Sequence, residues 1–345
     1  MLAPYAPFAE ETAMPAGQSR RDFLASASVA AAAGVFGARG SLADEGPPET
    51  TTIRLAYYGN NCLAPLLMAE DLLYAEGFTD VRYVEAPESF TIPELVARGD
   101  CHFANSFAGT LVSHMDNGLP ITGLSGVHSG CYELFAHEPI RTISDLRGKR
   151  VAIQDLNSDG YYYMAIMAGH VGLDPKTDFD WVPSRDNPME VFAEGKADAF
   201  LAFPPEPQEL RDRNIGRVII STVQDKPWSQ YLCCVLFSSK EFVRNHPIAT
   251  KRYLRAVLKA ADFCADEPEK AAQRLVEAGS RYEYALQTLT EIQYREWRNY
   301  DPEDTLRFYA LRLHEANMIQ TNPNQILAEG TDWRFLNELK RELKA

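Results

Sequence analysis

Polar and aromatic side chains gather in five short segments of this sequence, and their chemistry suits the holding of a small molecule. Asn and Ser offer hydrogen-bond donors and acceptors, and aromatic rings offer faces on which a planar or apolar group stacks. Asp155, Asp159 and Glu206 add three carboxylates, and no Lys or Arg occupies the five segments. These residues therefore favour a small organic molecule bearing a ring or an amine over a sulfonate or nitrate. The segments cover residues 58–61, 105–107, 128–130, 155–160 and 203–206.

Each of these segments follows a strand-like apolar run, which is the place where ligands bind in parallel α/β sheets. Asn, Ser, Asp and Gly are also ordinary in turns and helix caps, so a single segment has an alternative structural interpretation. Five such segments at one side of a sheet are stronger evidence for a ligand-binding site than a single segment is. The expected ligand-binding residues are Tyr58, Asn60, Asn61, Asn105, Ser106, Phe107, Ser129, Tyr132, Asn157, Ser158, Asp159, Tyr161, Phe203 and Glu206.

The reactive and metal-binding residue types show no spacing typical of a catalytic or metal site. Cysteines stand at positions 62, 101, 131, 233, 234 and 264, and the seven histidines are scattered. We expect most cysteines to be small buried core residues, and the presence of disulfides is left open. A nucleophile elbow and a phosphate-binding glycine loop are also missing from the sequence. We expect no catalytic residue, no metal and no cofactor. The rival interpretation is an enzyme in which Asp155 and Glu206 act as acid and base.

Short apolar runs alternate with helical patterns from Ile53 onward, which predicts an α/β fold with mostly parallel sheets flanked by helices. After Phe237 the pattern becomes helical to the end of the chain. Strands are expected at residues 53–57, 81–84, 101–104, 121–127, 131–137, 151–154, 179–182, 197–201, 217–220 and 231–237. Helices are expected near residues 66–77, 160–171, 188–194, 205–213, 254–261, 270–298 and 302–317.

The amino terminus carries the features of an export signal. Arg20-Arg21 precedes an uncharged stretch from Ala25 to Ala38, and small residues before Asp44 suit a signal peptidase that cuts after Ala43. We expect residues 1–43 to be a twin-arginine signal peptide and the mature protein to be periplasmic. Apolar runs stay below the about 20 residues of a spanning helix, so we expect no stable membrane insertion. A formal net charge of −14 makes nucleic acid an unsuitable partner.

Several segments of the chain resemble a known family in their order and spacing. Residues 53–58, 64–69 and 76–78 look like its first strand and helix, and residues 94–100 resemble a helix that ends in Gly-Asp. The most specific segment is Ile143-Ser144-Asp145-Leu146-Arg147-Gly148-Lys149-Arg150-Val151-Ala152, followed by residues 172–175 and 194–199. From about residue 53 to 258 the chain is similar to the NMT1/THI5-like substrate-binding proteins of ABC transporters, which include nitrate, alkanesulfonate, taurine and pyrimidine-precursor binders.

This resemblance implies a two-lobed periplasmic binding protein of type II, the Venus flytrap, with a mostly parallel sheet and flanking helices in each lobe. Lobe one would comprise residues 51–137 and 233–345, and lobe two residues 138–232, with crossings near His137 and Tyr231. The resemblance also implies a monomer that closes around a small-molecule ligand and delivers it to an ABC permease with its ATPase.

Three alternatives stay open at this point. A protein of the same fold could bind a sulfonate- or nitrate-type anion. The resembled family also includes pyrimidine-precursor synthases, enzymes that consume their own cofactor and histidine, but those carry a cysteine-dense iron-binding motif where this chain has only Cys233-Cys234, and they are not exported. A sensor subunit that presents its ligand-bound form to a membrane receptor fits the sequence equally well.

Overall fold

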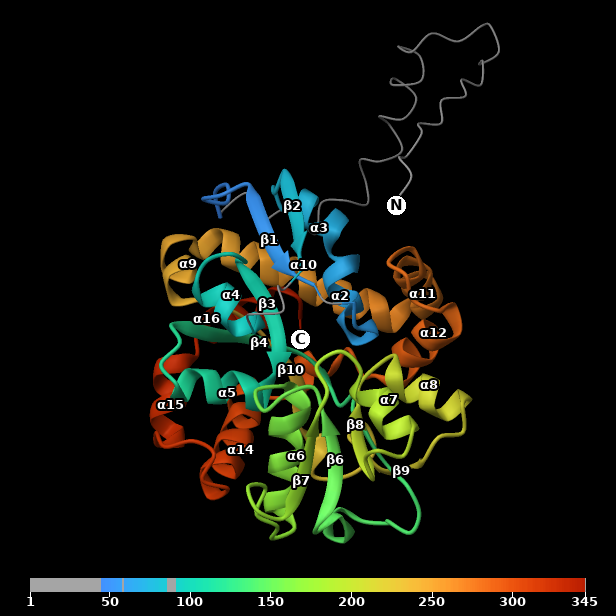
Figure 1. The fold of residues 1–345 in the computed structure, drawn as a ribbon. Helices are drawn as coiled ribbons and strands as arrows, with labels where there is room; N and C mark the ends of the chain where they lie inside the picture. Colours follow the sequence, from blue (N-terminus) through green and yellow to red (C-terminus); the bar gives the residue numbers. More distant parts are fainter. Residues whose placement is uncertain (1–44, 58, 86–90, 345) are drawn as a thin grey trace, which may run out of the picture. The chain divides into compact units, whose positions relative to one another are not determined.

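The strands form two sheets of five, and in each sheet one strand runs against the other four (Figure 1). The first sheet contains, in spatial order, β2 (Asp80–Val84), β1 (Thr52–Ala56), β3 (Phe103–Phe107), β10 (Leu232–Ser239) and β4 (Ile121–Ser129). The second contains β7 (Phe179–Pro183), β6 (Lys149–Ile153), β8 (Ala199–Ala202), β5 (Glu133–Ala136) and β9 (Arg217–Ser221). Strands β10 and β5 are antiparallel to both of their neighbours, and the remaining pairs are parallel.

The computed structural model describes residues 45–57, 59–85 and 91–344, and residues 47–345 form one compact unit. The expected signal peptide over residues 1–43 and the expected ligand contact Tyr58 lie outside the described residues. Within them, no helix has both the length and the apolar character needed to cross a bilayer.

Helices cover both sheets and connect their strands. The helices between strands are α2 (Ala64–Met68), α3 (Glu70–Ala75), α4 (Ile92–Ala97), α5 (Ala108–Asp116), α6 (Asp159–His170), α7 (Pro188–Ala193) and α8 (Glu206–Asp212), with the short 3-10 turns η1 (Asn61–Leu63), η2 (Ile143–Leu146) and η3 (Trp228–Gln230). The carboxyl-terminal helices are α9 (Lys240–Asn245), α10 (Pro247–Asp266), α11 (Pro268–Glu277), α12 (Tyr282–Glu291), α13 (Glu296–Asn299), α14 (Pro302–Glu315), α15 (Pro323–Gly330) and α16 (Arg334–Glu342). Helix α10 packs on α2, α3 and α16, whereas α14 contacts both α5 and α6, and α12 contacts α8.

Local sequence explains why β1 is a strand and where helix α6 begins. In β1, Ile53 and Leu55 are fully buried and alternate with less buried residues, as expected for a strand. Helix α6 starts after Ser158 because the Ser158 hydroxyl accepts the backbone N–H of Tyr161 at 3.3 Å and so satisfies one free amide. The sequence therefore places a helix start directly after strand β6.

The chain passes from the first sheet to the second earlier than the sequence predicts. Strand β5 pairs with β8 and β9 of the second sheet, although the sequence places residues 133–137 in lobe one with a crossing near His137. Only residues 130–132 separate β4 from β5, and the apolar run over 131–137 fits a strand of either sheet equally well. The return crossing lies between β9 and β10, where the sequence predicts it near Tyr231.

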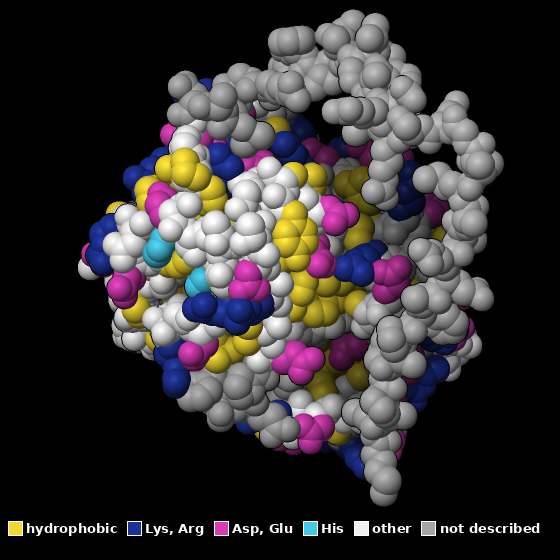
Figure 2. Space-filling model, turned by 90° about the horizontal axis from the view of Figure 1, so that it is seen from above, with side chains coloured by type: hydrophobic (Ala, Val, Ile, Leu, Met, Phe, Trp, Pro, Cys, Tyr) yellow, Lys and Arg dark blue, Asp and Glu magenta, His cyan; other side chains and the backbone are white. Residues whose placement is uncertain are grey.

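Charged side chains of both signs are interspersed on the face of the molecule shown in Figure 2. Exposed ion pairs of the described residues include Arg98 with Asp100 and Lys270 with Glu267. Exposed pairs of this kind each stabilise a fold by less than about 1 kcal/mol.

Candidate functional site

Loops from the two sheets contact each other where the carboxyl ends of the parallel strands meet. At the end of β3, the Ser106 hydroxyl lies 3.3 Å from the Asp159 carboxylate, which opens α6 after β6. The Asn61 backbone N–H, which follows β1, donates to the Pro204 carbonyl, which follows β8, at 3.3 Å. Four of the five segments singled out in the sequence thus meet in pairs across the two sheets.

The two crossing segments pack directly against each other beside these loops. The Thr222 hydroxyl, which follows β9, accepts the backbone N–H groups of Cys131 and Tyr132 at 3.1 and 2.9 Å. The Thr222 backbone N–H donates in turn to the Tyr132 carbonyl at 2.9 Å. Gly130 has a φ of +43°, and a side-chain carbon there would lie 2.3 Å from the Thr222 carbonyl oxygen. Close backbone approach at the crossings therefore requires glycine at position 130.

A buried aromatic cluster lines the same region. The Phe107 ring stacks on Tyr163 with centroids 4.2 Å apart, and Tyr132 meets the edges of both Phe107 and Phe203. Tyr309 of α14 completes the cluster, with its hydroxyl 3.4 Å from that of Tyr163. The sequence predicts Phe107, Tyr132 and Phe203 here but misses the two tyrosines. Both tyrosines are fully buried, so their rings support the cluster from within, and only Phe203 of the cluster is partly exposed.

Two carboxyl groups in this region carry raised pKa values. Burial raises the pKa of Asp159, although hydroxyl and amide donors around it, including the Ser106 and Tyr132 hydroxyls, oppose the shift. Burial likewise raises the pKa of Glu206 to about 8, against a backbone hydrogen bond from Phe203 at 3.0 Å, and the nearby Glu209 adds to the rise. Both groups hold a proton more readily than an exposed carboxylate does.

Three expected contacts on the loop and helix after β6 have other roles. The Tyr161 ring packs on Trp181 with centroids 5.0 Å apart, and its hydroxyl approaches the Met318 sulfur at 4.0 Å, so this side chain is directed away from the aromatic cluster. Asn157 is exposed at the tip of the loop. Ser158 caps α6. Tyr163, two residues after Tyr161, is the residue of this helix that packs in the aromatic cluster.

The expected contacts on the first sheet are mostly buried. Asn105 and Ser129 lie within β3 and β4, opposite Leu236 and Leu232 of β10. Asn60 precedes η1 without a side-chain cap. Asn61 is fully buried; its amide oxygen accepts the Ser280 hydroxyl at 2.8 Å, and its amide nitrogen has no hydrogen-bond partner among the described residues. Asn61 therefore keeps donor capacity at this edge of the first sheet.

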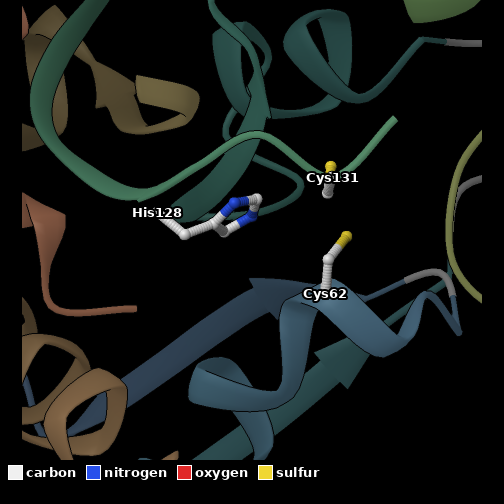
Figure 3. A group of neighbouring side chains, drawn as sticks. All are labelled: Cys62, His128 and Cys131. Carbon is white, nitrogen blue, oxygen red and sulfur yellow. The ribbon is translucent and has the colours of Figure 1, made fainter. Parts of the chain in front are cut away.

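A group of thiols and one imidazole lies beside the crossings. Cys62, His128 and Cys131 form one group whose sulfur and nitrogen atoms are all within 4.8 Å of one another (Figure 3). Cys131, Cys233 and Cys234 form a second group by the same criterion. The Cys131 and Cys233 sulfurs are 3.5 Å apart, and every cysteine is a free thiol. Burial disfavours the imidazolium, but the Cys234 and Cys62 sulfurs outweigh it and raise the pKa of His128 to about 10.

Sequence spacing misses this group because its members come from separate elements. Cys62 belongs to η1, His128 to β4 and Cys131 to the first crossing segment. The signal available in the sequence was position, because Cys62 and His128 follow expected strands and Cys131 begins the next one. Short ligand motifs cannot reveal donors that only the sheet brings together.

The two-lobed α/β architecture is that of the periplasmic binding proteins, and solved structures confirm it. The alkanesulfonate-binding protein of Xanthomonas axonopodis pv. citri, bound to MOPS, matches with a TM-score of 0.68 at 16% identity, over 83% of this chain and 99% of that one. The periplasmic nitrate-binding protein of Synechocystis PCC 6803 matches with a TM-score of 0.73 at 15% identity, over 87% and 90%. At these identities the likeness concerns the fold and leaves the ligand open.

Sequence comparison establishes the family. The NMT1/THI5 like family model matches residues 60–271, and the chain belongs to this family, as its motifs predict. A curated relative, the 4-amino-5-hydroxymethyl-2-methylpyrimidine phosphate synthase of Legionella pneumophila, is 23% identical over 235 residues, which cover 66% of this chain and 73% of the relative. One relative of this chain is thus named as an enzyme.

Proposed function

We propose that this protein is a periplasmic solute-binding protein without catalytic activity, which holds a small organic molecule where its two sheets meet and delivers it to an ABC permease. The observation that carries the proposal is the contact of Ser106 with Asp159 beside the cluster of Phe107, Tyr132 and Phe203. Polar and aromatic side chains from both sheets converge there, as capture between two lobes requires. The sulfonate- and nitrate-binding neighbours and the export signal expected over residues 1–43 support this role.

The side chains at this junction favour a ligand with a ring or an amine. Asp159 and Glu206 present carboxyl groups, and the five loop segments contain no Lys or Arg to attract an anion. The Asn61 amide and the Ser106 hydroxyl supply neutral hydrogen-bonding groups, and the partly exposed Phe203 ring supplies apolar surface. A dianion would be repelled by the two carboxyl groups once they ionise.

Native mass spectrometry of the mature protein, purified from its own periplasm, tests the binding role directly. A copurifying small molecule identifies the ligand. A thermal-shift panel then compares heterocyclic amines with alkanesulfonates and nitrate. Stabilisation by a ring-bearing amine supports the proposal, because a ligand that binds only the folded state raises its stability. Stabilisation by sulfonates or nitrate alone rejects it.

The variant Asp159→Asn decides the sign of the ligand charge. An amine that pairs with Asp159 should lose about 1.5–3 kcal/mol of binding free energy, which is roughly 10- to 150-fold in affinity. An anionic ligand should instead bind more tightly, because the variant removes a negative charge. Asp180→Asn, on the exposed end of β7, is the matched control and should leave the affinity unchanged. Calorimetric titration measures all three proteins.

The synthase relative supports a second candidate, an enzyme that consumes its own histidine and cofactor. Intact-protein mass spectrometry before and after incubation with the cofactor distinguishes the two. An unchanged protein mass is expected for a binding protein. A pyrimidine product together with an altered histidine would replace the proposal by the synthase reaction.

A further inference from the structure

Three side chains from separate elements bring two sulfurs and one imidazole into a compact buried group. Figure 3 shows Cys62 and Cys131 approaching from opposite sides with the His128 ring beside them. Their donor atoms all lie within 4.8 Å of one another. The exposed fractions are 3% for Cys62, 0% for His128 and 4% for Cys131, so bulk water does not hydrate these atoms.

The His128 imidazole has one nitrogen whose hydrogen-bonding capacity is not met by the described residues. Nδ1 lies 3.4 Å from the Ser129 carbonyl oxygen, which can only accept, so Nδ1 carries the proton in that contact. Nε2 is buried and has no hydrogen-bond partner in the described part of the chain. A buried, unsatisfied polar atom is costly. An ion bound at Nε2 removes that cost, and a backbone carbonyl at the other nitrogen is the usual support of a metal-binding histidine.

The donor set selects the kind of ion. Two thiols and an imidazole, with no carboxylate in the group, suit a soft or borderline ion such as Zn²⁺ and do not suit Mg²⁺ or Ca²⁺. Zinc–sulfur bonds of about 2.3 Å in a tetrahedron place neighbouring sulfurs roughly 3.8 Å apart. The Cys131 and Cys233 sulfurs are 3.5 Å apart, but Cys233 belongs to the neighbouring group with Cys234, so the donors for this ion are Cys62, His128 and Cys131.

We propose that Cys62, His128 and Cys131 form a binding site for a zinc ion at the carboxyl edge of the first sheet. The ion bonds to both sulfurs and to Nε2; each thiol and the protonated imidazole release a proton to solvent, and no electron is transferred. Because Cys131 belongs to the first crossing segment, the ion ties that segment to β4 and to the turn after β1. This inference goes beyond solute binding and does not depend on the identity of the solute.

Metal analysis of the whole mature protein tests the site. Protein purified under reducing conditions from zinc-supplemented cells should contain about one zinc ion per chain, as a single site of this kind predicts. Refolding with Co²⁺ in place of zinc should give the intense absorption of thiolate-to-cobalt charge transfer. This measurement needs no substitution and therefore does not depend on a variant that folds.

Variants identify the ligands. Cys62→Ser and His128→Asn should each lower zinc affinity by more than the roughly 100-fold that loss of a supporting group costs. Cys101→Ser, another buried cysteine outside both groups, is the matched control and should keep the ion. The proposal is overturned if the wild-type protein binds no zinc and gives no cobalt–thiolate absorption. It is also overturned if Cys62→Ser retains full zinc, or if Cys131 and Cys233 are joined as a disulfide in the native protein.

Discussion

The substitution Gly130→Ala measures how tightly the two crossing segments pack. Position 130 has a φ of +43°, and an added Cβ would meet the Thr222 carbonyl oxygen at 2.3 Å and its carbon at 2.6 Å. A left-handed conformation costs a non-glycine residue about 1–2 kcal/mol. Forcing a carbon into a packed contact costs about 1–3 kcal/mol more, since Thr222 cannot move without breaking its bonds to Cys131 and Tyr132. We expect the free energy of unfolding to fall by about 2–5 kcal/mol in total.

The matched control for this substitution is Gly148→Ala. Gly148 also has a positive φ, +70°, but no heavy atom lies within 4 Å of the position that a Cβ would take there, so only the conformational cost applies. Urea unfolding of both variants gives the difference between their free energies of unfolding directly, provided that the two have the same dependence on urea concentration. Gly130→Ala should lose about 1–3 kcal/mol more than Gly148→Ala. Equal losses would refute the close contact between the crossing segments.

Two further predictions concern closure and pH. Arg211 of α8 pairs with Glu291 of α12 at 2.9 Å, so Arg211→Ala should shift the ligand-free protein toward a more open form by about 0.2–1 kcal/mol, seen as a larger radius of gyration in X-ray scattering. Arg213 pairs with Glu190 of α7, so the control Arg213→Ala should leave the radius of gyration unchanged. An equal increase in radius for both variants would contradict the role of Arg211. The Glu206 pKa rises from 4.5 to about 8, so over this window the folded protein keeps a proton that the unfolded chain releases, and stability falls as pH rises. In Glu206→Gln, the free energy of unfolding measured with urea should differ less between about pH 5 and pH 8 than in the wild type. An unchanged difference would mean that another group causes the pH dependence.

The elements of the fold were predictable because their apolar patterns are local. The alternation from Ile53 and the helix start at Ser158 both depend on residues within one or two turns of the chain. The sheet to which β5 belongs was not predictable. It carries apolar residues on both faces, so its pattern fits either sheet, and only the pairing with β8 and β9 decides between them.

Site residues were predictable at strand ends and unpredictable inside α6. Ser106, Phe107 and Asp159 were proposed because carboxyl ends of parallel strands are the general place for ligands, and the structure brings Ser106 and Asp159 together. Helix α6 is buried from Tyr162 to Ala168 on all faces, so no periodicity distinguishes Tyr163 from Tyr161. The group of Cys62, His128 and Cys131 was not predicted for another reason. Its donor atoms become neighbours only when β1 and β4 lie in the same sheet.

The position of β10 in the first sheet sets the order in which the two sheets can be completed. All five strands of the second sheet come from one continuous stretch, whereas β3 and β4 of the first sheet are joined only through β10, which follows that stretch in the chain. As the chain is synthesised, the second sheet can close while β3 and β4 still present unpaired edges. Such edges are where partly folded chains associate with one another. The period before Leu232 emerges is therefore the time at which this protein is most exposed to misassembly.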